Sequence, residues 1–474
     1  MSEILWSAAE LAAVFGPASG AVAGATGVSI DSRSVNPREL FVAIRGDALD
    51  GHDYVQRAFA AGAAAALVEA GRAEALKAFG PVYAVEDTLR GLEALGVAAR
   101  ARAKAKIVAV TGSVGKTSAK EMLRLALGAN GSTHASVASF NNHWGVPLTL
   151  ARLPANAEYA VFEIGMNHAG EITPLVGFVR PHVAVITTIA PVHIEYLGSI
   201  EAIADAKAEI FTGVVAGGVA IVNRDAPQFE RLAAAARARK LELRAFGQGE
   251  GAYARLISRE PSEAGSRLRV RLGEREFAFE LGAPGAHMAD NAVGVLAVVE
   301  ALGADVATAA RALAGFQAQK GRGERFALNL PEGAVTVIDE SYNANPVSMR
   351  AALALLGATT PAAGGRRIAV IGDMLELGAD GAELHAGLAA DLETNGVDLL
   401  FAAGPLSRAL YEAATPGRRA FWADRAAGLE DALSSALRAG DVVMIKASNG
   451  SRMGPLVAAL KDHFSKPRDA DSGH

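Results

Sequence analysis

The sequence of 474 residues contains no cysteine. Disulfides, cysteine-ligated zinc and a cysteine nucleophile are therefore all excluded. Long apolar runs are also missing, because stretches such as AFAAGAAAALV at 58–68 are too short to cross a bilayer. The N-terminal segment MSEILWSAAELAAVFG has neither the basic region nor the cleavage site of a signal peptide. We expect a cytoplasmic protein without a membrane partner.

An excess of positive charge is missing as well. The formal net charge is −5, which gives no reason to expect a nucleic-acid partner. What is present is 51% hydrophobic and 20% charged residues, a composition typical of a globular α/β enzyme. The length predicts about three domains, because single domains usually have roughly 100–200 residues. We place them at 1–104, 105–319 and 320–465, followed by a disordered polar tail at 466–474.

The strongest functional signal is the stretch KIVAVTGSVGKTS at 106–118. An apolar strand is followed by Gly112-x-x-Gly115-Lys116-Thr117 and then by a helix-forming segment. Glycines let backbone N–H groups converge on an anion, and a helix N-terminus adds partial positive charge. Lysine and threonine at the helix start suit nucleotide phosphates and Mg²⁺. The first glycine of the complete phosphate-loop pattern is missing, so a plain glycine-rich turn is the alternative interpretation.

Apolar, strand-like segments alternate with helical patterns along the rest of the chain. This alternation predicts α/β domains with doubly wound, mostly parallel sheets, whose ligands bind beyond the carboxyl ends of the strands. Polar residues fall at those ends: Glu163, His193, Asn223 and Asp225 in the second unit, and Asp339, Asp373, Lys446 and Ser448 in the third. Glu163 and His193 could complete a Mg²⁺ site with Thr117. The strand-like segments are 28–33, 40–44, 159–165, 183–190, 217–223, 335–340, 367–373, 399–404 and 441–448.

Several of these positions also have a purely structural interpretation. Lys207 lies in a predicted helix, SIEAIADAKAEIF, and by itself would be a solvent-exposed lysine. Glu163 and His193, taken singly, could be hydrogen-bonded loop residues. The basic stretch KGRGERF at 320–326 could be a solvated linker or a hinge that closes over an anionic ligand. The first unit also has polar residues near the ends of its predicted strands, and we interpret them as turn residues: Asp31, Ser32, Arg33, His52 and Asp53.

In combination and in this order, the motifs resemble the Mur ligases, the ATP-dependent amide ligases of peptidoglycan synthesis. The resemblance covers about residues 25–460 and implies an N-terminal UDP-sugar domain, a central P-loop-type ATP domain and a C-terminal Rossmann-like ligase domain. The segment 342–346, YNANP, is similar to the branch that joins D-alanyl-D-alanine to UDP-N-acetylmuramoyl-tripeptide through an acyl phosphate. The segments that carry the resemblance are VTGSVGKTSAKEM, FNNHWGVPLTL, FEIGMNHAGEI, APVHIEYLGS, AKAEIF, DESYNANP, GDMLELG and IKAS.

The resemblance also implies roles for individual residues. Thr117 and Glu163 would share one Mg²⁺, His193 would ligate a second, and Lys207 would be carbamylated by CO₂ to serve the metals. Asn291 would contact adenine, Arg322 the γ-phosphate and Asp339 the ribose. The residues expected to act in catalysis are Lys116, His193, Lys207 and Arg322. The phosphate-loop residues expected to bind ATP are Thr111, Gly112, Ser113, Val114, Gly115, Lys116, Thr117 and Ser118. The residues expected to bind the other substrates are Asp31, Ser32, Arg33, Asn142, Tyr342, Asn343, Asn345 and Ser448.

The chain departs from the family pattern in the segment 287–291, HMADN, which lacks the first asparagine of the usual His-Asn-x-x-Asn. Arg322 and Arg325 are both candidates for the hinge arginine. Two alternative functions stay open: a Mur-type ligase that adds a single amino acid, and a nucleotide-switched binding module without chemistry. Folylpolyglutamate synthase is a weaker alternative, because it would lack the N-terminal nucleotide-sugar domain. We expect the protein to act as a monomer.

Overall fold

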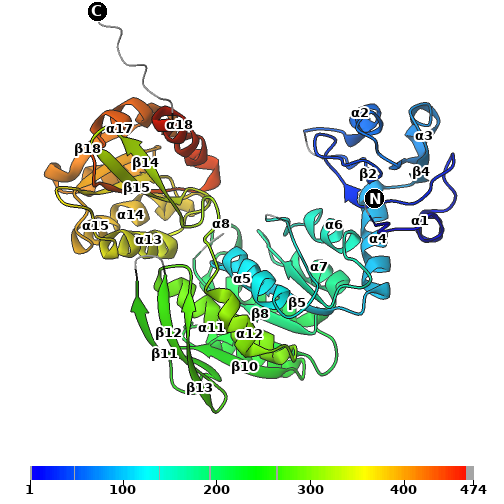
Figure 1. Ribbon diagram of the computed structural model, residues 1–474, viewed down its shortest axis with the longest axis horizontal. Coiled ribbons are helices and arrows are strands. Elements are labelled where there is room, and N and C mark those ends of the chain that lie inside the picture. The colour runs from blue at the N-terminus through cyan, green and yellow to red at the C-terminus, as the bar shows by residue number, and fades with distance from the viewer. Residues whose placement is uncertain (1–2, 47, 138, 192–193, 263–264, 466–474) are drawn as a thin grey trace, which may run out of the picture.

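The computed structural model describes residues 3–46, 48–137, 139–191, 194–262 and 265–465. Its strands form three separate sheets of four, nine and six strands. Each sheet is the centre of one domain, and the central domain lies between the other two along the longest axis of the molecule (Figure 1). The predicted ligand His193 and the predicted tail at 466–474 lie outside the described residues.

The N-terminal domain is built on four short parallel strands in the order β1-β2-β3-β4. Leu40 and Val42 of β2 pack in one apolar core and Phe41 packs in another, so both faces of the sheet are covered. Its elements are α1 (Ala8–Phe15), β1 (Val28–Ser29), β2 (Leu40–Val42), α2 (Val55–Ala60), β3 (Ala65–Glu69), α3 (Ala70–Leu76), β4 (Val82–Val85) and α4 (Thr88–Arg102).

The N-terminal domain is docked on the central domain through α4, which packs against α6 (Gly145–Ala151). The apolar core of the first domain continues into α6, so the two domains share buried surface. Trp6 is 1% exposed, and its Nε1–H donates to the carbonyl of Ala151 at 2.8 Å. Arg152 Nε–H donates in the other direction, to the carbonyl of Val28 at 2.6 Å. Apolar burial and paired polar groups therefore hold the two domains together.

The central sheet has the strand order β13-β12-β11-β10-β9-β8-β5-β7-β6, and neighbouring strands from β11 to β6 are parallel. Val108 and Val110 of β5 point into one core, under α5, α11 and α12. Ile107 and Ala109 point into the other, under α6, α7, α9 and α10. Helices on both faces confirm the predicted doubly wound, mostly parallel α/β fold. The elements are β5 (Lys106–Thr111), α5 (Lys116–Gly128), β6 (Thr133–Ala135), α6, β7 (Tyr159–Glu163), α7 (Ile172–Val179), β8 (Val183–Ile186), α8 (Ile194–Leu197), α9 (Ile200–Ala208), β9 (Val219–Asn223), α10 (Phe229–Ala238), β10 (Glu242–Gly247), β11 (Ala254–Pro261), β12 (Ser266–Leu272), β13 (Arg275–Leu281), α11 (Ala286–Ala301) and α12 (Val306–Leu313).

One edge of this sheet was not expected from the sequence. Strands β11, β12 and β13 pair antiparallel and extend the parallel sheet. In β12, Leu268 and Val270 are buried, whereas Arg267 and Arg269, which alternate with them along the strand, are exposed. This strict alternation of apolar and charged residues is typical of a strand that packs on one face only.

The C-terminal domain has six strands in the order β14-β15-β19-β16-β17-β18. Strand β14 is antiparallel to β15 and the other pairs are parallel. Met444 and Ile445 of β19 pack in different cores, so this sheet too is covered on both faces, as predicted. The elements are β14 (Glu324–Leu330), β15 (Gly333–Glu340), α13 (Pro346–Ala358), β16 (Arg367–Gly372), α14 (Gly381–Ala386), α15 (Ala389–Thr394), β17 (Leu399–Ala403), α16 (Ser407–Ala413), β18 (Arg419–Ala423), α17 (Glu430–Ala436), β19 (Val442–Lys446) and α18 (Met453–Ser465).

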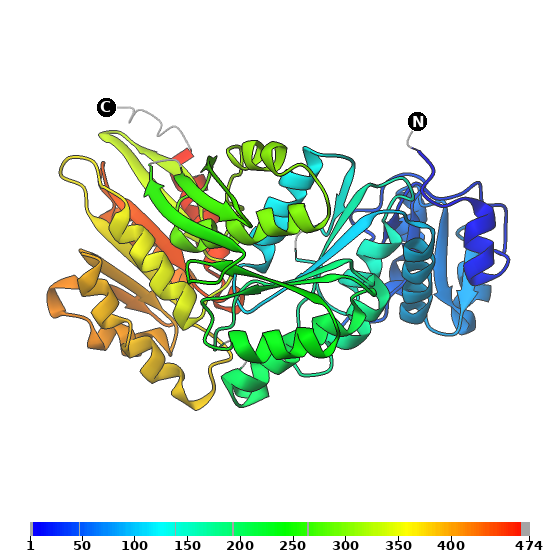
Figure 2. The ribbon, with the colours of Figure 1, turned by 90° about the horizontal axis from the view of Figure 1, so that it is seen from below.

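Seen from below, the three domains again follow one another in chain order, with the phosphate-loop domain in the middle (Figure 2). Within the described part of the chain, no helix combines the length and apolar character needed to cross a membrane.

Candidate active site

The phosphate loop joins β5 to α5 at the carboxyl end of β5, which lies between β8 and β7 in the central sheet. Gly115, the residue before α5, has a φ of 87°, a left-handed conformation that favours glycine. A Cβ at Gly115 would also lie 2.7 Å from Nδ2 of Asn291, whose side chain covers the loop from α11. The sequence therefore needs glycine here for two reasons, and the N-terminus of α5 is left at the surface of a cleft, where an anion can reach it.

Two hydrogen bonds connect the phosphate loop to the segment that follows β8. Ser113 Oγ–H donates to the carbonyl of Ala190 at 3.0 Å. Thr187 Oγ1–H donates to the carbonyl of Val114 at 2.6 Å. These bonds join the phosphate loop to the segment that follows the neighbouring strand β8 and support the shape of the loop from that side.

Lys116 bends back over the phosphate loop. Its Nζ donates to the carbonyl of Gly112 at 2.6 Å. Burial lowers the pKa of Lys116, the Glu163 carboxylate raises it, and the Arg322 guanidinium lowers it. The ammonium therefore lies between the loop, a carboxylate and a second cation, in an electrostatic setting where an added anion would be strongly attracted.

Oxygen atoms that suit a magnesium ion lie directly behind Lys116. The side chains of Thr117 and Glu163 are almost completely buried, and Thr117 Oγ1–H donates to Glu163 Oε2 at 2.9 Å. Glu163 Oε1 accepts a hydrogen bond from Asn141 Nδ2 at 2.7 Å. A hydroxyl and a carboxylate fit the preference of Mg²⁺ for oxygen ligands. Among the described residues no group of three His, Asp or Glu side chains could hold a metal, so Thr117 and Glu163 would supply only part of the coordination.

Lys207 is buried, so its interpretation as a solvent-exposed lysine is wrong. The residue lies on α9, as predicted, but its side chain is only 2% exposed. Burial and the positive charge of Lys116 lower the pKa of Lys207 well below its usual value. An uncharged amine is the form that can react with CO₂, so the setting suits the modification that the resemblance implies.

From the C-terminal domain, Arg322 reaches across to the central domain. Its Nη2 donates to Ser139 Oγ at 3.1 Å, and its guanidinium lies 4.2 Å from the centre of the Tyr342 ring. Arg325 instead donates from Nη2 to Thr359 Oγ1 at 3.1 Å, inside the C-terminal domain. Of the two candidate hinge arginines, Arg322 is therefore the one that faces the central domain.

Asp339, which was expected to contact the ribose, makes two hydrogen bonds within the C-terminal domain, and its contact with a ribose stays a prediction. It is completely buried, and its Oδ2 accepts the backbone N–H of Gly321 at 3.0 Å. Its Oδ1 accepts the backbone N–H of Ser341, also at 3.0 Å. One oxygen thus binds the segment that carries Arg322, the other binds the segment that follows β15, and Asp339 is not among the residues that line the cleft. In this conformation its carboxylate anchors the hinge between the domains.

A single cleft of about 470 Å³ lies between the central and C-terminal domains and brings many of the predicted residues together. Asn345, which lines it, also caps α13 by accepting the N–H of Ser348 at 2.9 Å. The predicted residues that line it are Ser113, Val114, Gly115, Lys116, Thr117, Ser118, Glu163, Asn291, Arg322, Tyr342, Asn343 and Asn345.

Other predicted residues lie outside this lining. Thr111, Gly112 and Lys207 are buried and do not line the cleft. Asn142 accepts the N–H of Gly145 at 2.9 Å and so caps α6. Ser448 Oγ accepts the N–H of Leu375 at 2.9 Å.

The cleft also contains residues that sequence reasoning did not select. Asn141, not its neighbour Asn142, reaches Glu163, although both belong to the FNN motif. The motifs DESYNANP and IKAS also supply cleft residues, and the altered HMADN motif supplies another. These additional lining residues are Ser139, His287 and Glu340, and they line the cleft together with Lys446, which the sequence places at a strand end.

The residues expected to bind the UDP sugar lie in the N-terminal domain, away from this cleft. Asp31 and Arg33 form an exposed ion pair with an oxygen–nitrogen distance of 2.7 Å. The side-chain and backbone hydrogen bonds from Arg33 lower the pKa of Asp31 to about 2. Ser32, between them, is 8% exposed. The three residues share a turn after β1, and their role in binding stays a prediction.

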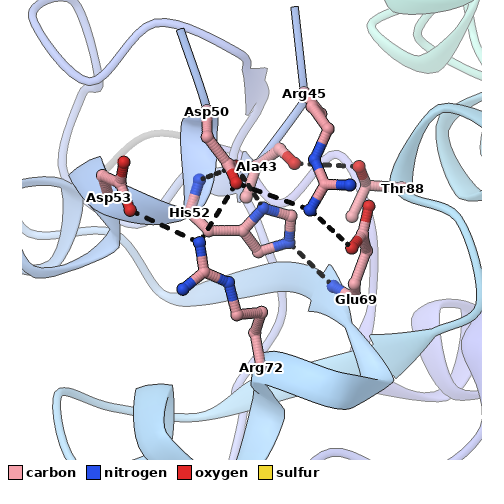
Figure 3. Close-up of polar contacts among 8 residues, drawn as sticks. All are labelled: Ala43, Arg45, Asp50, His52, Asp53, Glu69, Arg72 and Thr88. Carbon is pink, nitrogen blue, oxygen red and sulfur yellow. Dashed lines mark hydrogen bonds and ion pairs between the residues drawn. The ribbon is translucent and has the colours of Figure 1, made fainter.

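His52 is buried and belongs to a network of polar contacts in the same domain (Figure 3). Its Nδ1–H donates to Asp50 Oδ1 at 2.6 Å, and its Nε2 accepts the backbone N–H of Glu69 at 2.9 Å. The Oδ2 atom of the same aspartate lies 3.1 Å from Nη2 of Arg72 and 3.6 Å from Nη2 of Arg45. Both ring nitrogens have partners within the domain, which supports the structural interpretation of this histidine.

Three family descriptions match the sequence. "Mur ligase family, catalytic domain" matches residues 25–88, "Mur ligase middle domain" matches residues 110–299, and "Mur ligase, glutamate ligase domain" matches residues 321–449. Among curated proteins, the UDP-N-acetylmuramoyl-tripeptide–D-alanyl-D-alanine ligase of Bacillus subtilis (strain 168) is 33% identical over 441 residues. That match covers 92% of this chain and 93% of the relative.

Solved structures give the same result. The crystal structure of MurF from Acinetobacter baumannii superposes with a TM-score of 0.81 at 28% identity, and the match covers 96% of this chain and 99% of that one. MurF ligase from Thermotoga maritima in complex with ADP has a TM-score of 0.74 at 24% identity, with 93% of this chain and 98% of that chain covered. At this identity, the match to the Thermotoga maritima structure shows a similar fold only.

Proposed function

The chain belongs to the Mur ligase family, and we propose that it is the ATP-dependent ligase that joins D-alanyl-D-alanine to UDP-N-acetylmuramoyl-tripeptide. One observation carries the proposal. The phosphate loop of the central domain and the segment 342–345 of the C-terminal domain line the same cleft. An ATP phosphate and an acceptor that is held by the C-terminal domain can therefore meet there, as amide-bond formation requires.

The reaction that this arrangement supports begins with activation of a carboxylate. A carboxylate is a poor acyl donor, because oxide is a poor leaving group. Transfer of the γ-phosphoryl group from ATP would give an acyl phosphate, from which phosphate can leave. We assign Lys116 to the phosphate oxygens and Arg322 to the charge that develops during transfer, because both cations line the cleft. Their main contribution is to position the groups and stabilise negative charge.

We propose that Thr117 and Glu163 hold a magnesium ion, with His193 and a carbamylated Lys207 completing the metal sites. A bound magnesium ion neutralises phosphate charge and helps to align the transferring group. The fit of the residues supports this assignment: a hydroxyl and a carboxylate at 2.9 Å, and a buried lysine with a lowered pKa. We assign Asn291, which covers the loop, to adenine. Asp31, Ser32 and Arg33 are assigned to the UDP end of the sugar nucleotide.

Phosphate release with purified protein tests the proposed function. We expect release from ATP that requires both UDP-N-acetylmuramoyl-tripeptide and D-alanyl-D-alanine. Release with a single amino acid in place of the dipeptide would identify a different Mur-type ligase. ATP binding without turnover in the presence of both substrates would favour the nucleotide-switched binding module.

A further inference from the structure

A carboxylate and a lysine that the proposed chemistry leaves unused lie on the C-terminal side of the cleft. Glu340 ends β15 and Lys446 ends β19, and the two residues are register partners in the parallel sheet. Lys446 Nζ donates to Glu340 Oε2 at 3.2 Å and to the carbonyl of Asn343 at 2.9 Å. Both side chains line the same cleft as the phosphate loop.

The two partners differ in their access to the cleft. The side chain of Lys446 is 2% exposed, whereas that of Glu340 is 13% exposed. A charge as deeply buried as that of Lys446 needs an opposite charge beside it, and Glu340 supplies that charge. Glu340 Oε1 has no hydrogen-bond donor among the described residues, and a Cβ at Gly323 would lie 3.4 Å from it. One carboxylate oxygen is therefore fixed by the lysine, and the other is available to a ligand.

The other carboxylates of the cleft are committed elsewhere. Glu163 accepts hydrogen bonds from Thr117 and Asn141, on the side of the predicted metal. Asp290 accepts a hydrogen bond from Gln248 Nε2 at 3.1 Å. Glu340 thus stands out among the described cleft carboxylates, because it lies on the domain that would hold the amine and keeps one oxygen open.

We propose that Glu340 is the general base that removes a proton from the incoming amine. The proposal rests on the proposed function, since a dipeptide enters the cleft as an ammonium, which cannot attack a carbonyl. In the step, one N–H proton passes to Glu340 and the free electron pair of nitrogen forms the C–N bond to the acyl carbon. The C–O bond to phosphate breaks, and the leaving phosphate takes the bonding electrons and a second proton. Glu340 then releases its proton to water, so that the products are the amide, hydrogen phosphate and one proton.

A change of nucleophile tests the assignment. Hydroxylamine is uncharged at neutral pH and attacks an acyl phosphate without a base. For Glu340→Gln we expect ligation of D-alanyl-D-alanine to fall in kcat by about 10²–10⁴-fold, the usual contribution of a general base. With ATP, UDP-N-acetylmuramoyl-tripeptide and hydroxylamine, the same variant should form hydroxamate within about threefold of the wild-type rate. Glu340→Asp, which keeps a carboxylate, should recover part of the ligation.

The matched control is Glu332→Gln, the same substitution at an exposed residue in the turn between β14 and β15, which should leave both rates unchanged. Equal losses of ligation and hydroxamate formation in Glu340→Gln would overturn the assignment, because the residue would then act before the amine arrives or in folding. Unchanged ligation would also overturn it, as would a loss confined to KM for the dipeptide, which would indicate binding without proton transfer. If the wild type formed no hydroxamate and no ligation product, the proposed function itself would fail.

Discussion

The substitution Asp339→Asn tests whether Asp339 anchors the segment that carries Arg322 or binds the nucleotide. The Asp339 carboxylate accepts one N–H from Gly321 and one from Ser341, each at 3.0 Å, in a completely buried position. Asparagine has nearly the same shape, but only its oxygen can accept. Its amide group would therefore face one of the two backbone N–H groups with a second donor.

The expected cost follows from these contacts. A hydrogen bond to a charged group contributes about 1.5–3 kcal/mol, and the substitution removes one such bond. Because Gly321 precedes Arg322, we expect the loss to displace the arginine that reaches the central domain. If the whole cost falls on the reacting complex, kcat decreases by about ten- to a hundredfold, since about 1.4 kcal/mol corresponds to a factor of ten.

Steady-state kinetics with all three substrates measure this effect. We expect a lower kcat with a KM for ATP within about threefold of wild type. Asp424→Asn, at an exposed position of the same domain, is the control and should change neither value. A large rise in KM for ATP with an unchanged kcat would refute the hinge reasoning and would restore the contact between Asp339 and the ribose.

Three further predictions concern other charged residues. Lys116→Ala should abolish ATP turnover, measured as phosphate release, and retained turnover would remove Lys116 from the phosphate site. Lys207→Ala should lose ligase activity severely and regain part of it with small carboxylates such as acetate, which replace the carbamate; unchanged activity would exclude the residue. Burial raises the pKa of Asp50, but the hydrogen bonds from His52 and Arg72 lower it further, so the net shift is downward. The lowered pKa of Asp50 stabilises the folded state above about pH 4, the pKa of an aspartate in the unfolded chain, and this stabilisation is lost as the pH falls below that value. In Asp50→Asn, the free energy of unfolding should therefore depend less steeply on pH below about pH 4, as measured by acid denaturation.

The phosphate loop could be predicted because its determinants are local. The left-handed φ of Gly115 and the helix start at Lys116 follow from the order of a few neighbouring residues. The doubly wound sheets were equally accessible, because alternation of apolar strands with helices is a property of the sequence itself. The antiparallel edge strands escaped notice, although the alternation in β12 was a usable signal.

The direction and burial of individual side chains could not be predicted in the same way. The charged residue Asp205, two positions before Lys207, suggests an exposed helix face, but the apolar Ile203 and Ala204, one helical turn before it, were a usable signal of burial. Asn141 and Asn142 are adjacent and identical, but the cap of α6 takes one and Glu163 takes the other. Asp339 lies one residue before the end of β15, close to where ligands bind, but its carboxylate accepts the N–H of Gly321. Such assignments depend on contacts between distant segments.

The shared core between the N-terminal and central domains has a mechanical consequence. Because Trp6 and the shared core join α6 to the N-terminal domain, we expect these two domains to move together and relative movement during turnover to be concentrated at the joint before β14. Loading of the sugar nucleotide and release of the lengthened product then both depend on that one joint. A compound wedged into it would block the enzyme without imitating any of its substrates.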